Sequence, residues 1–380
     1  MACTAPEKKP ESSQEIISAD SVPAEVKASP DSIKPAPADA NISGIAKIVG
    51  GVADSASPFK NIVNYSGFKK YSAGMNSAFR RYEDRLLNRF RSWSRTELPE
   101  LEEGPRNVFY PFSGPDIGFA YSLCPGASNY FMFGLEPVGS IPSISKKTSP
   151  AQIDTILRSM GESVRDNMNY SFFITKNMVV DFRQSLVKGT IPVLMFYMAN
   201  LGLEIVSLDF VEINKEGEIM ASRAGGKDTG VRIGFFNPKT PEKLQHVFYF
   251  SENIANGNAG FLASVDSMCA KLPGMVTFVK SSSYCMHNTQ AFKKIRTIIL
   301  NHSGLLIQDD TGVPFSFLNK GEWKNSFYGK YTKPINLFAS KLQGDFKAAM
   351  AEAKPIDFKF GYNTPSNILV ARKVNSSQKK

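Results

Sequence analysis

The sequence predicts an α/β protein, with a mostly parallel sheet flanked by helices and an amphipathic helix before it. Strand-like and helix-like segments alternate from about residue 106 onward, which is typical of parallel strands joined by helical crossovers. Hydrophobic residues make up 42% of the 380 residues, and aromatic residues 11%, enough for a sizeable core. Apolar residues recur at helical spacing over 67–96.

The N-terminal 50 residues have a different composition from the rest of the chain. They are rich in Pro, Ala, Ser, Glu and Lys, a composition that buries too little apolar surface to fold alone. We therefore expect residues 1–50 to be a disordered tether, and residues 373–380 to be a disordered tail.

Residues 51–104 are expected to form a basic helical arm. Within it, one apolar stripe runs along the helix 67–96, and the opposite face is rich in Lys and Arg. Docking of the stripe on the protein's own core is the first interpretation; binding of the basic helix to an anionic membrane surface is the alternative. The stripe consists of Phe68, Tyr71, Met75, Phe79, Tyr82, Leu86, Phe90 and Trp93.

Residues 105–372 are expected to form the α/β domain. Strands are predicted at 107–112, 129–136, 204–213, 230–236, 246–251, 275–280, 304–308, 356–360 and 367–372. Helices are predicted at 116–123, 150–170, 174–186, 192–203, 257–271, 288–302 and 336–352. This order indicates a Rossmann-like sheet, with the last short strands as an antiparallel edge.

The net charge and the number and spacing of cysteines and histidines limit the kinds of ligand that the protein is expected to bind. The 45 Lys and Arg against 35 Asp and Glu give a formal net charge of +10, which favours polyanions without choosing among them. No specific nucleic-acid motif is present. The four cysteines show no paired metal spacing and there are three histidines, so no metal site is expected. Cys269 and Cys285 would pair in an exported chain, or remain free thiols.

The stretch YPFSGPDIGFAYSL, residues 110–123, is the first site candidate. A strand ends in a Ser-Gly-Pro-Asp turn, a helix follows, and Glu136 comes 22 residues after Gly114. In nucleoside sites, such a turn approaches the ligand and a later acid binds the ribose hydroxyls. Pro115 removes one N–H donor, so a nucleoside without a pyrophosphate is the better match.

Two longer stretches carry a family resemblance. NVFYPFSGPDIGFAYSLCPGASNYFMFGLEP and MVTFVKSSSYCMHNTQAFKKIRTIILNHSGLLIQDD resemble the strand–loop–helix segments of Rossmann-like S-adenosylmethionine methyltransferases. The resemblance implies that Ser113, Gly114 and Asp116 line the cofactor site and that Glu136 holds its ribose. The glycine-rich loop of that family is replaced here by Ser-Gly-Pro-Asp. The competing interpretation is that Asp116 caps its helix and Glu136 lies in an exposed turn.

Three further ligand candidates follow later strands. Lys280 opens the polar run KSSSYCMH, and Asp309 and Asp310 follow the strand at 304–308. Ligand-binding groups of α/β sheets lie at such strand ends. The two aspartates would coordinate a cation or position a substrate amine; otherwise they form a turn.

The start of the chain carries a second resemblance. Ala2-Cys3 followed by a polar tether resembles the mature end of a bacterial lipoprotein, and the whole chain resembles bacterial proteins of unknown function. The first resemblance implies a lipidated Cys3 and a place in the cell envelope. The alternative is a cytoplasmic protein with an ordinary disordered leader.

Two functions follow from these observations. The first is an envelope-anchored α/β protein that binds a small ligand at its strand ends. The alternative is an S-adenosylmethionine-dependent methyltransferase or a degenerate relative, with S-adenosylmethionine as cofactor.

Overall fold

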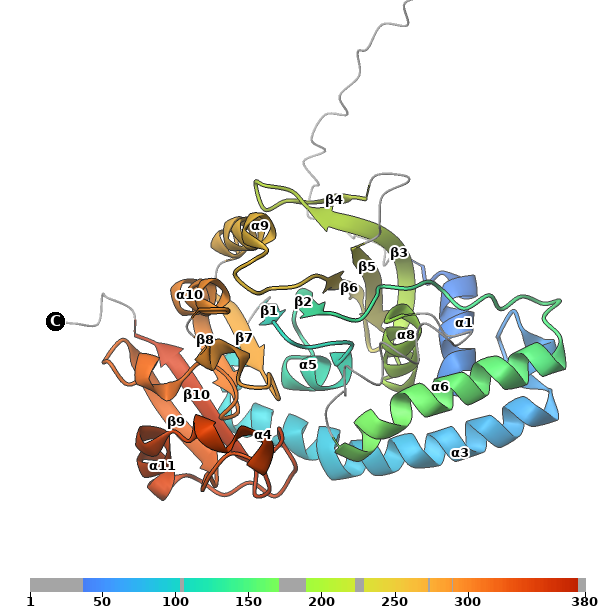
Figure 1. Ribbon diagram of the computed structural model, residues 1–380. Coiled ribbons are helices and arrows are strands. Elements are labelled where there is room, and N and C mark those ends of the chain that lie inside the picture. The colour runs from blue at the N-terminus through green and yellow to red at the C-terminus, as the bar shows by residue number, and fades with distance from the viewer. Residues whose placement is uncertain are drawn as a thin grey trace, which may run out of the picture. The chain divides into compact units, whose positions relative to one another are not determined.

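One mixed sheet organises the protein. The structure, a computed structural model, describes residues 37–102, 106–170, 189–222, 229–272, 274–288 and 290–374, all within the compact unit Pro35–Lys380. Its strands are β1 Asn107–Tyr110, β2 Asn129–Gly134, β3 Glu204–Ile213, β4 Ile219–Ala221, β5 Gly230–Asn237, β6 Thr240–Ser251, β7 Met275–Val279, β8 Ser303–Gln308, β9 Trp323–Gly329 and β10 Asn367–Lys373. They form a ten-stranded sheet in the order β4-β3-β5-β6-β2-β1-β7-β8-β10-β9 (Figure 1).

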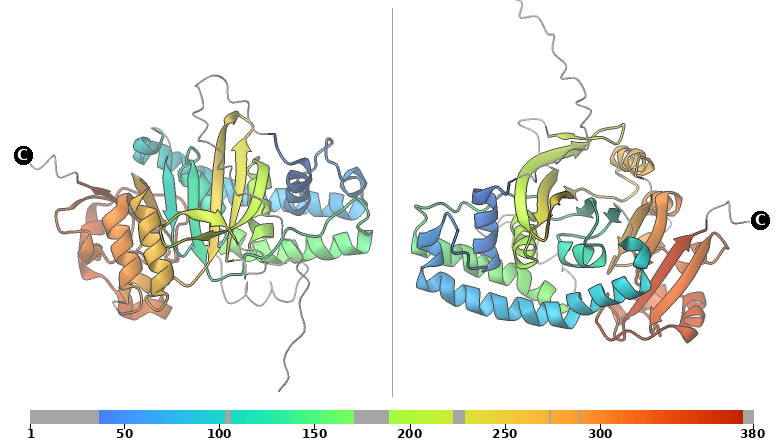
Figure 2. Two further views of the ribbon diagram at one scale, coloured as in Figure 1. Left: turned by 90° about the horizontal axis from the view of Figure 1, so that it is seen from above. Right: turned by 180° about the vertical axis from the view of Figure 1, so that it is seen from behind.

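Helices cover both faces of this sheet, which confirms the predicted α/β class. On one face the core contains residues of α1, α3 to α6 and α8; on the other it contains residues of α9, α10 and α11. Figure 2 shows α9 and α10 on the face opposite α3 and α6. The α-helices are α1 Ala40–Gly50, α2 Lys60–Val63, α3 Ser66–Tyr82, α4 Asn88–Glu97, α5 Ile117–Leu123, α6 Pro150–Tyr170, α8 Ile191–Asn200, α9 Ala259–Ala270, α10 Lys293–His302 and α11 Gly344–Ala349. Shorter turns are the π-helix η1 Glu83–Leu87 and the 3₁₀ helices η2 Pro99–Leu101, η3 Cys285–His287, η4 Phe315–Phe317, η5 Asn336–Lys341 and η6 Met350–Glu352.

The prediction of a mostly parallel sheet is wrong. The strands β6, β2, β1, β7 and β8 form a parallel centre. The pairs on either side, which involve β3, β4 and β5 or β9 and β10, are antiparallel. Short connections explain part of this difference: only two residues separate β5 from β6, and such a hairpin permits antiparallel pairing alone.

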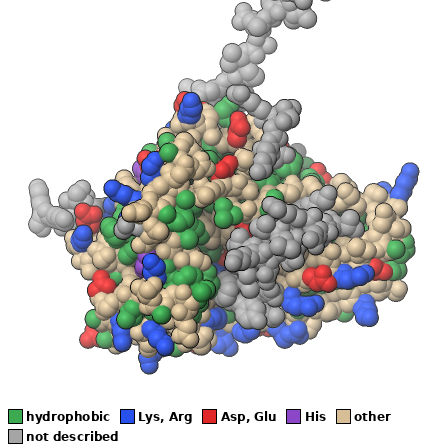
Figure 3. All heavy atoms as spheres, in the orientation of Figure 1, with side chains coloured by type: hydrophobic (Ala, Val, Ile, Leu, Met, Phe, Trp, Pro, Cys, Tyr) green, Lys and Arg blue, Asp and Glu red, His purple; other side chains and the backbone are tan. Residues whose placement is uncertain are grey.

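The apolar stripe of the N-terminal arm lies in the core. Helices α3, η1 and α4 form one helical run from Ser66 to Glu97. The stripe residues between Phe68 and Trp93 are buried, apart from the half-buried Tyr71. They pack with α5 and α8, which leaves the basic side chains to solvent. Blue Lys and Arg side chains are spread over the face seen in Figure 3 rather than gathered into one patch.

Several boundaries differ from the sequence predictions. Residues 40–50 form α1 rather than part of the tether, because Ile45, Ile48 and Val49 are buried. The segment 356–360 forms no strand, whereas 323–329 does. The predicted helix 336–352 is broken into η5, α11 and η6.

Some predictions fall outside the described residues. These are Cys3 with most of the tether, the helix at 174–186, and most of the tail. Within the described residues no helix has the length and apolar character needed to cross a bilayer.

Candidate functional site

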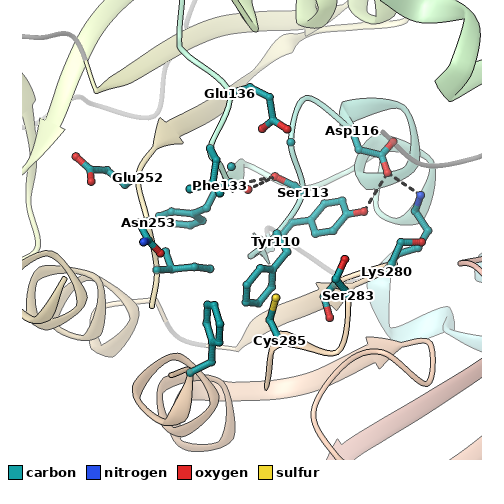
Figure 4. Close-up of a pocket in the computed structure, with 18 of the residues that line it drawn as sticks. Tyr110, Ser113, Asp116, Phe133, Glu136, Glu252, Asn253, Lys280, Ser283 and Cys285 are labelled. Carbon is teal, nitrogen blue, oxygen red and sulfur yellow. Dashed lines mark hydrogen bonds and ion pairs between the residues drawn. The ribbon is translucent and has the colours of Figure 1, made fainter. Parts of the chain in front are cut away.

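A cavity of about 250 Å³ opens at the carboxyl ends of β1, β2, β6 and β7 (Figure 4). The chain proceeds from β1 to β2 on one side of β1 and later returns to β7 on its other side. The crevice beyond β1 and β7 is therefore a topological switch point, where α/β sheets bind ligands. The lining residues are Tyr110, Phe112, Ser113, Gly114, Asp116, Phe133, Gly134, Leu135, Glu136, Glu252, Asn253, Ile254, Lys280, Ser281, Ser282, Ser283, Cys285, Phe292 and Tyr362.

The loop after β1 is held tightly against the end of β2. The amides of Ser113 and Gly114 both donate to the Phe133 carbonyl, at 2.8 and 3.3 Å. The Ser113 hydroxyl also accepts from the Phe133 amide at 3.0 Å. Phe112 and Gly114 have φ of 60° and 52°, a region that non-glycine residues rarely adopt. These bonds occupy the two amides that a phosphate would need.

Glu136 reaches the same loop from the end of β2. It is 2% exposed, so the prediction of an exposed turn is wrong. The Tyr249 hydroxyl donates to its carbonyl at 2.8 Å and lies 3.2 Å from Oε2. A Cβ added to Gly114 would lie 3.6 Å from the Glu136 carboxylate. Two of the predicted cofactor residues, from the segments that follow β1 and β2, are thus brought together.

Asp116 and Lys280 form a buried ion pair in the cavity wall. Their Oδ2 and Nζ are 2.9 Å apart, with both side chains at most 3% exposed. The Tyr110 hydroxyl donates to the same Oδ2 at 2.9 Å, as Figure 4 shows. Burial raises the pKa of the Asp116 carboxyl, and the Lys280 ammonium opposes this rise. The pair also packs on Phe119, whose ring centre is 4.1 Å from Nζ.

Sequence reasoning missed the wall that follows β6. Glu252, Asn253 and Ile254 line the cavity, and in Figure 4 the first two lie across it from Asp116 and Lys280. The Glu252 amide donates to the Gly134 carbonyl at 3.0 Å. Glu252 and Asn253 directly follow the predicted strand 246–251 and could have been predicted as site residues. They were not, because the sequence does not reveal that this strand lies beside β2.

Asp309 and Asp310 do not line the cavity. Both are buried, at 1% and 2% exposure, and their carboxylates bond to protein groups. Asp309 Oδ2 accepts from the Ser281 amide at 2.9 Å, whereas Asp310 Oδ1 accepts from Asn363 and Asn367 at 2.8 and 2.9 Å. In the described part of the chain, no group of three or more His, Cys, Asp or Glu residues is placed to hold a metal ion.

The described cysteines are free thiols. Cys124 and Cys269 are buried, and Cys285 is partly exposed in the cavity. Cys269 and Cys285 therefore do not form the disulfide considered for an exported chain. Burial raises the pKa of the Cys285 thiol, which disfavours the reactive thiolate.

Comparisons of the chain with protein-family models, curated proteins and solved structures find no match. The site must be interpreted from its own geometry.

Proposed function

We propose that the cavity is a nucleoside site for S-adenosylmethionine, and that the protein is a methyltransferase using this cofactor or a degenerate relative of one. The observation that carries the proposal is the buried Glu136 carboxylate beside Gly114, at the adjacent carboxyl ends of β2 and β1. A carboxylate in this place accepts hydrogen bonds from the two hydroxyls of a ribose.

The arrangement of the central strands supports a Rossmann-like site. The parallel centre β6-β2-β1-β7-β8 is followed by the antiparallel β10. Most of the cavity lining comes from segments that directly follow β1, β2, β6 or β7, and Phe292 and Tyr362 complete it. The resemblance of the β1–β2 and β7–β8 segments to the methyltransferase family agrees with this placement.

The charges of the cavity favour a cationic nucleoside over a nucleotide. Asp116, Glu136 and Glu252 outnumber Lys280, and the amides of the β1 loop are already bonded to Phe133. A phosphate would meet carboxylates without the N–H donors that stabilise it elsewhere. S-adenosylmethionine supplies a positively charged sulfonium and an electrophilic methyl group; its charge suits this environment.

Different side chains of the cavity would contact different parts of the ligand. Glu136 would hold the ribose, and Glu252 and Asn253 offer hydrogen-bond acceptors and donors for the polar edge of a base. Phe133, Ile254 and Phe292 provide apolar contact surface for the base. The Asp116–Lys280 pair would face the amino-acid end of the ligand.

Calorimetric titration of the full chain with S-adenosylhomocysteine and S-adenosylmethionine tests this proposal. We expect micromolar binding, weakened about 10- to 100-fold in Glu136→Gln, because one charged acceptor for the ribose is lost. Glu216→Gln, at an exposed position of the β3–β4 hairpin, is the matched control. Absence of heat from either ligand, or equal binding by both variants, would contradict a nucleoside site.

A panel of ligands tests the charge argument separately. Adenosine should bind more weakly than S-adenosylmethionine, and AMP more weakly still, because its phosphate adds negative charge to a cavity in which carboxylates outnumber the one lysine. Tight binding of AMP or NAD would show that the loop after β1 releases its amides to a phosphate.

A second proposal is that the protein is anchored in the cell envelope through a lipidated Cys3, which Ala2-Cys3 and the polar tether support. It places the same cavity in the cell envelope as a site for another small ligand. The two proposals differ in location, because S-adenosylmethionine is made and used in the cytoplasm.

A further inference from the structure

Exposed apolar side chains gather near the mouth of the cavity. In the described part of the chain, five large hydrophobic side chains are exposed: Leu135, Met220, Leu244, Leu337 and Leu342. Leu135 lines the cavity itself. Leu337 and Leu342, which are 81% and 54% exposed, lie in the 3₁₀ helix η5 and directly after it. Single exposed apolar residues are common, but several in one region indicate an interaction surface.

Phe338 packs η5 against the rim of the cavity. Its ring stacks on Tyr362, with ring centres 6.0 Å apart and planes at 24°, and its ring centre lies 5.0 Å from that of Tyr284. Tyr362 lines the cavity, and its hydroxyl lies 3.0 Å from the hydroxyl of Ser283, another lining residue. Because Ser283 is exposed, this part of the wall is the rim, and η5 lies directly beside it.

The segment that carries the two leucines is fixed at both ends. Before η5, Tyr331 is buried in the core. After η5, the Gln343 side-chain amide donates to the Asp310 carbonyl at 3.0 Å, and the Gln343 side-chain oxygen accepts from the Phe315 amide at 2.8 Å. Between these anchors no residue of η5 is buried. The fold therefore presents both leucines to solvent from a fixed position.

The charged side chains of the same segment are all positive. Residues 330–343 contain three lysines, Lys330, Lys333 and Lys341, and no Asp or Glu. The first two lysines are exposed and the third is partly exposed. Leucines flanked by lysines suit the surface of an anionic bilayer, where apolar side chains enter the acyl boundary and ammonium groups meet the headgroup phosphates. Free phosphate would account for the lysines alone, and a wholly apolar protein partner for the leucines alone.

We propose that Leu337, Leu342 and the three lysines form an interfacial segment, which binds an anionic phospholipid bilayer and holds the cavity mouth at its surface. This inference goes beyond the proposed nucleoside site, and it depends neither on that site nor on lipidation of Cys3. It also differs from membrane binding by the basic helix 67–96. The apolar stripe of that helix lies in the core, so the helix offers only charge to a bilayer, whereas residues 330–343 offer both charge and exposed leucines.

Flotation of the full chain with lipid vesicles tests this proposal. The vesicles contain phosphatidylcholine, with or without phosphatidylglycerol, and Cys3→Ala in every chain removes any contribution from an acyl chain. We expect binding that requires phosphatidylglycerol and weakens with added salt. Affinity should fall about tenfold or more in the double variant Leu337→Glu, Leu342→Glu, because two apolar side chains no longer enter the bilayer. The double variant Lys333→Glu, Lys341→Glu should also bind more weakly, since two attractive headgroup contacts become repulsive.

The matched control is the double variant Lys239→Glu, Leu244→Glu. Both residues are exposed, Lys239 in the β5–β6 turn and Leu244 near the start of β6, at the opposite end of β6 from the cavity. This variant should float as the parent chain does. Because the substituted leucines are exposed, each leucine variant should keep the thermal unfolding midpoint of the parent chain, which scanning calorimetry checks.

Other outcomes would overturn the proposal. Absence of flotation of the parent chain, or equal flotation of the parent and the leucine variant, would do so. A loss of binding confined to Arg80→Glu, Arg81→Glu, at exposed positions of α3, would assign the bilayer contact to the basic helix instead. A parent dimer that the leucine variant converts to a monomer, with no flotation of either, would assign the leucines to a contact with a second copy of the chain.

Discussion

The buried ion pair of Asp116 and Lys280 shows how a single residue supports the site. A buried pair gains little over apolar packing, yet removing one partner leaves an uncompensated charge. Lys280 therefore contributes by compensating the negative charge of the buried Asp116 carboxylate, which also accepts a hydrogen bond from Tyr110.

Lys280→Met is expected to lower the free energy of unfolding by about 3–5 kcal/mol at pH 8, because Asp116 becomes a buried, unpaired carboxylate. The loss should shrink as the pH falls, since the pKa of Asp116 is already raised by burial and protonation removes the charge. Urea unfolding at pH 8 and pH 5 measures this. The double variant with Asp116→Asn should regain most of the stability; equal losses in both variants would refute the pairing argument.

Gly134 determines where the Glu136 carboxylate can lie. A Cβ at this position would be 2.4 Å from Glu136 Oε2 and 2.7 Å from the Tyr249 hydroxyl. Gly134→Ala should therefore displace Glu136 and weaken S-adenosylhomocysteine binding more than tenfold, as measured by calorimetry. Gly260→Ala, where a Cβ would meet nothing within 4 Å, should bind as the wild type. Unchanged binding in Gly134→Ala would show that Glu136 does not bind the ligand.

At the level of elements, the helical run α3–η1–α4 is part of the core. Phe90 packs against five aromatic rings: Trp93, Phe119, Phe278, Phe358 and Phe360. These rings come from the helix, from α5, from β7 and from the segment before β10. One side chain of the N-terminal arm thus ties together elements far apart in sequence.

Phe90→Ala should lower the free energy of unfolding by about 3–5 kcal/mol, because it removes a large buried ring and leaves a cavity. Denaturant unfolding of the wild type and the variant measures this loss of unfolding free energy. Leu337→Ala, at an 81% exposed leucine, should change stability by less than about 0.5 kcal/mol. A small loss at Phe90 would mean that the arm is separable from the sheet.

Elements were predicted best where apolar periodicity is strong. The spacing of the stripe from Phe68 to Trp93 and the run at 107–110 each indicated their element directly. The edge strand β9 was missed because its sequence WKNSFYG does not alternate: three polar residues, Lys324 to Ser326, come before the adjacent Phe327 and Tyr328. The segment at 356–360 has a strand-like pattern, but within the described residues only the neighbouring Lys354 makes an isolated bridge, to Tyr328.

For the whole molecule, location separates the two proposed functions. If Cys3 is lipidated, the native gene product should incorporate labelled fatty acid and partition into a detergent phase, since the acyl chain adds buried methylene groups. A Cys3→Ala variant should lose both properties. An unmodified Cys3 in the native product would remove the envelope proposal and favour the cytoplasmic methyltransferase.

The sequence by itself determined the α/β class, the core stripe of the arm, and the loop and acid that flank the cavity. These features depend on spacing along the chain, which local propensity and hydrophobic period express. Tertiary structure alone decided the antiparallel flanks of the sheet, the wall at Glu252 and Asn253, and the burial of Asp309 and Asp310 outside the cavity. Each of these depends on which strands become neighbours. In the centre of the sheet β1 pairs with β7 and β2 with β6, which are distant in the sequence, whereas the flanks depend on which nearby strands form antiparallel pairs. For that reason Asp309 was predicted as a ligand group, whereas the fold places it beneath the loop that a ligand would touch.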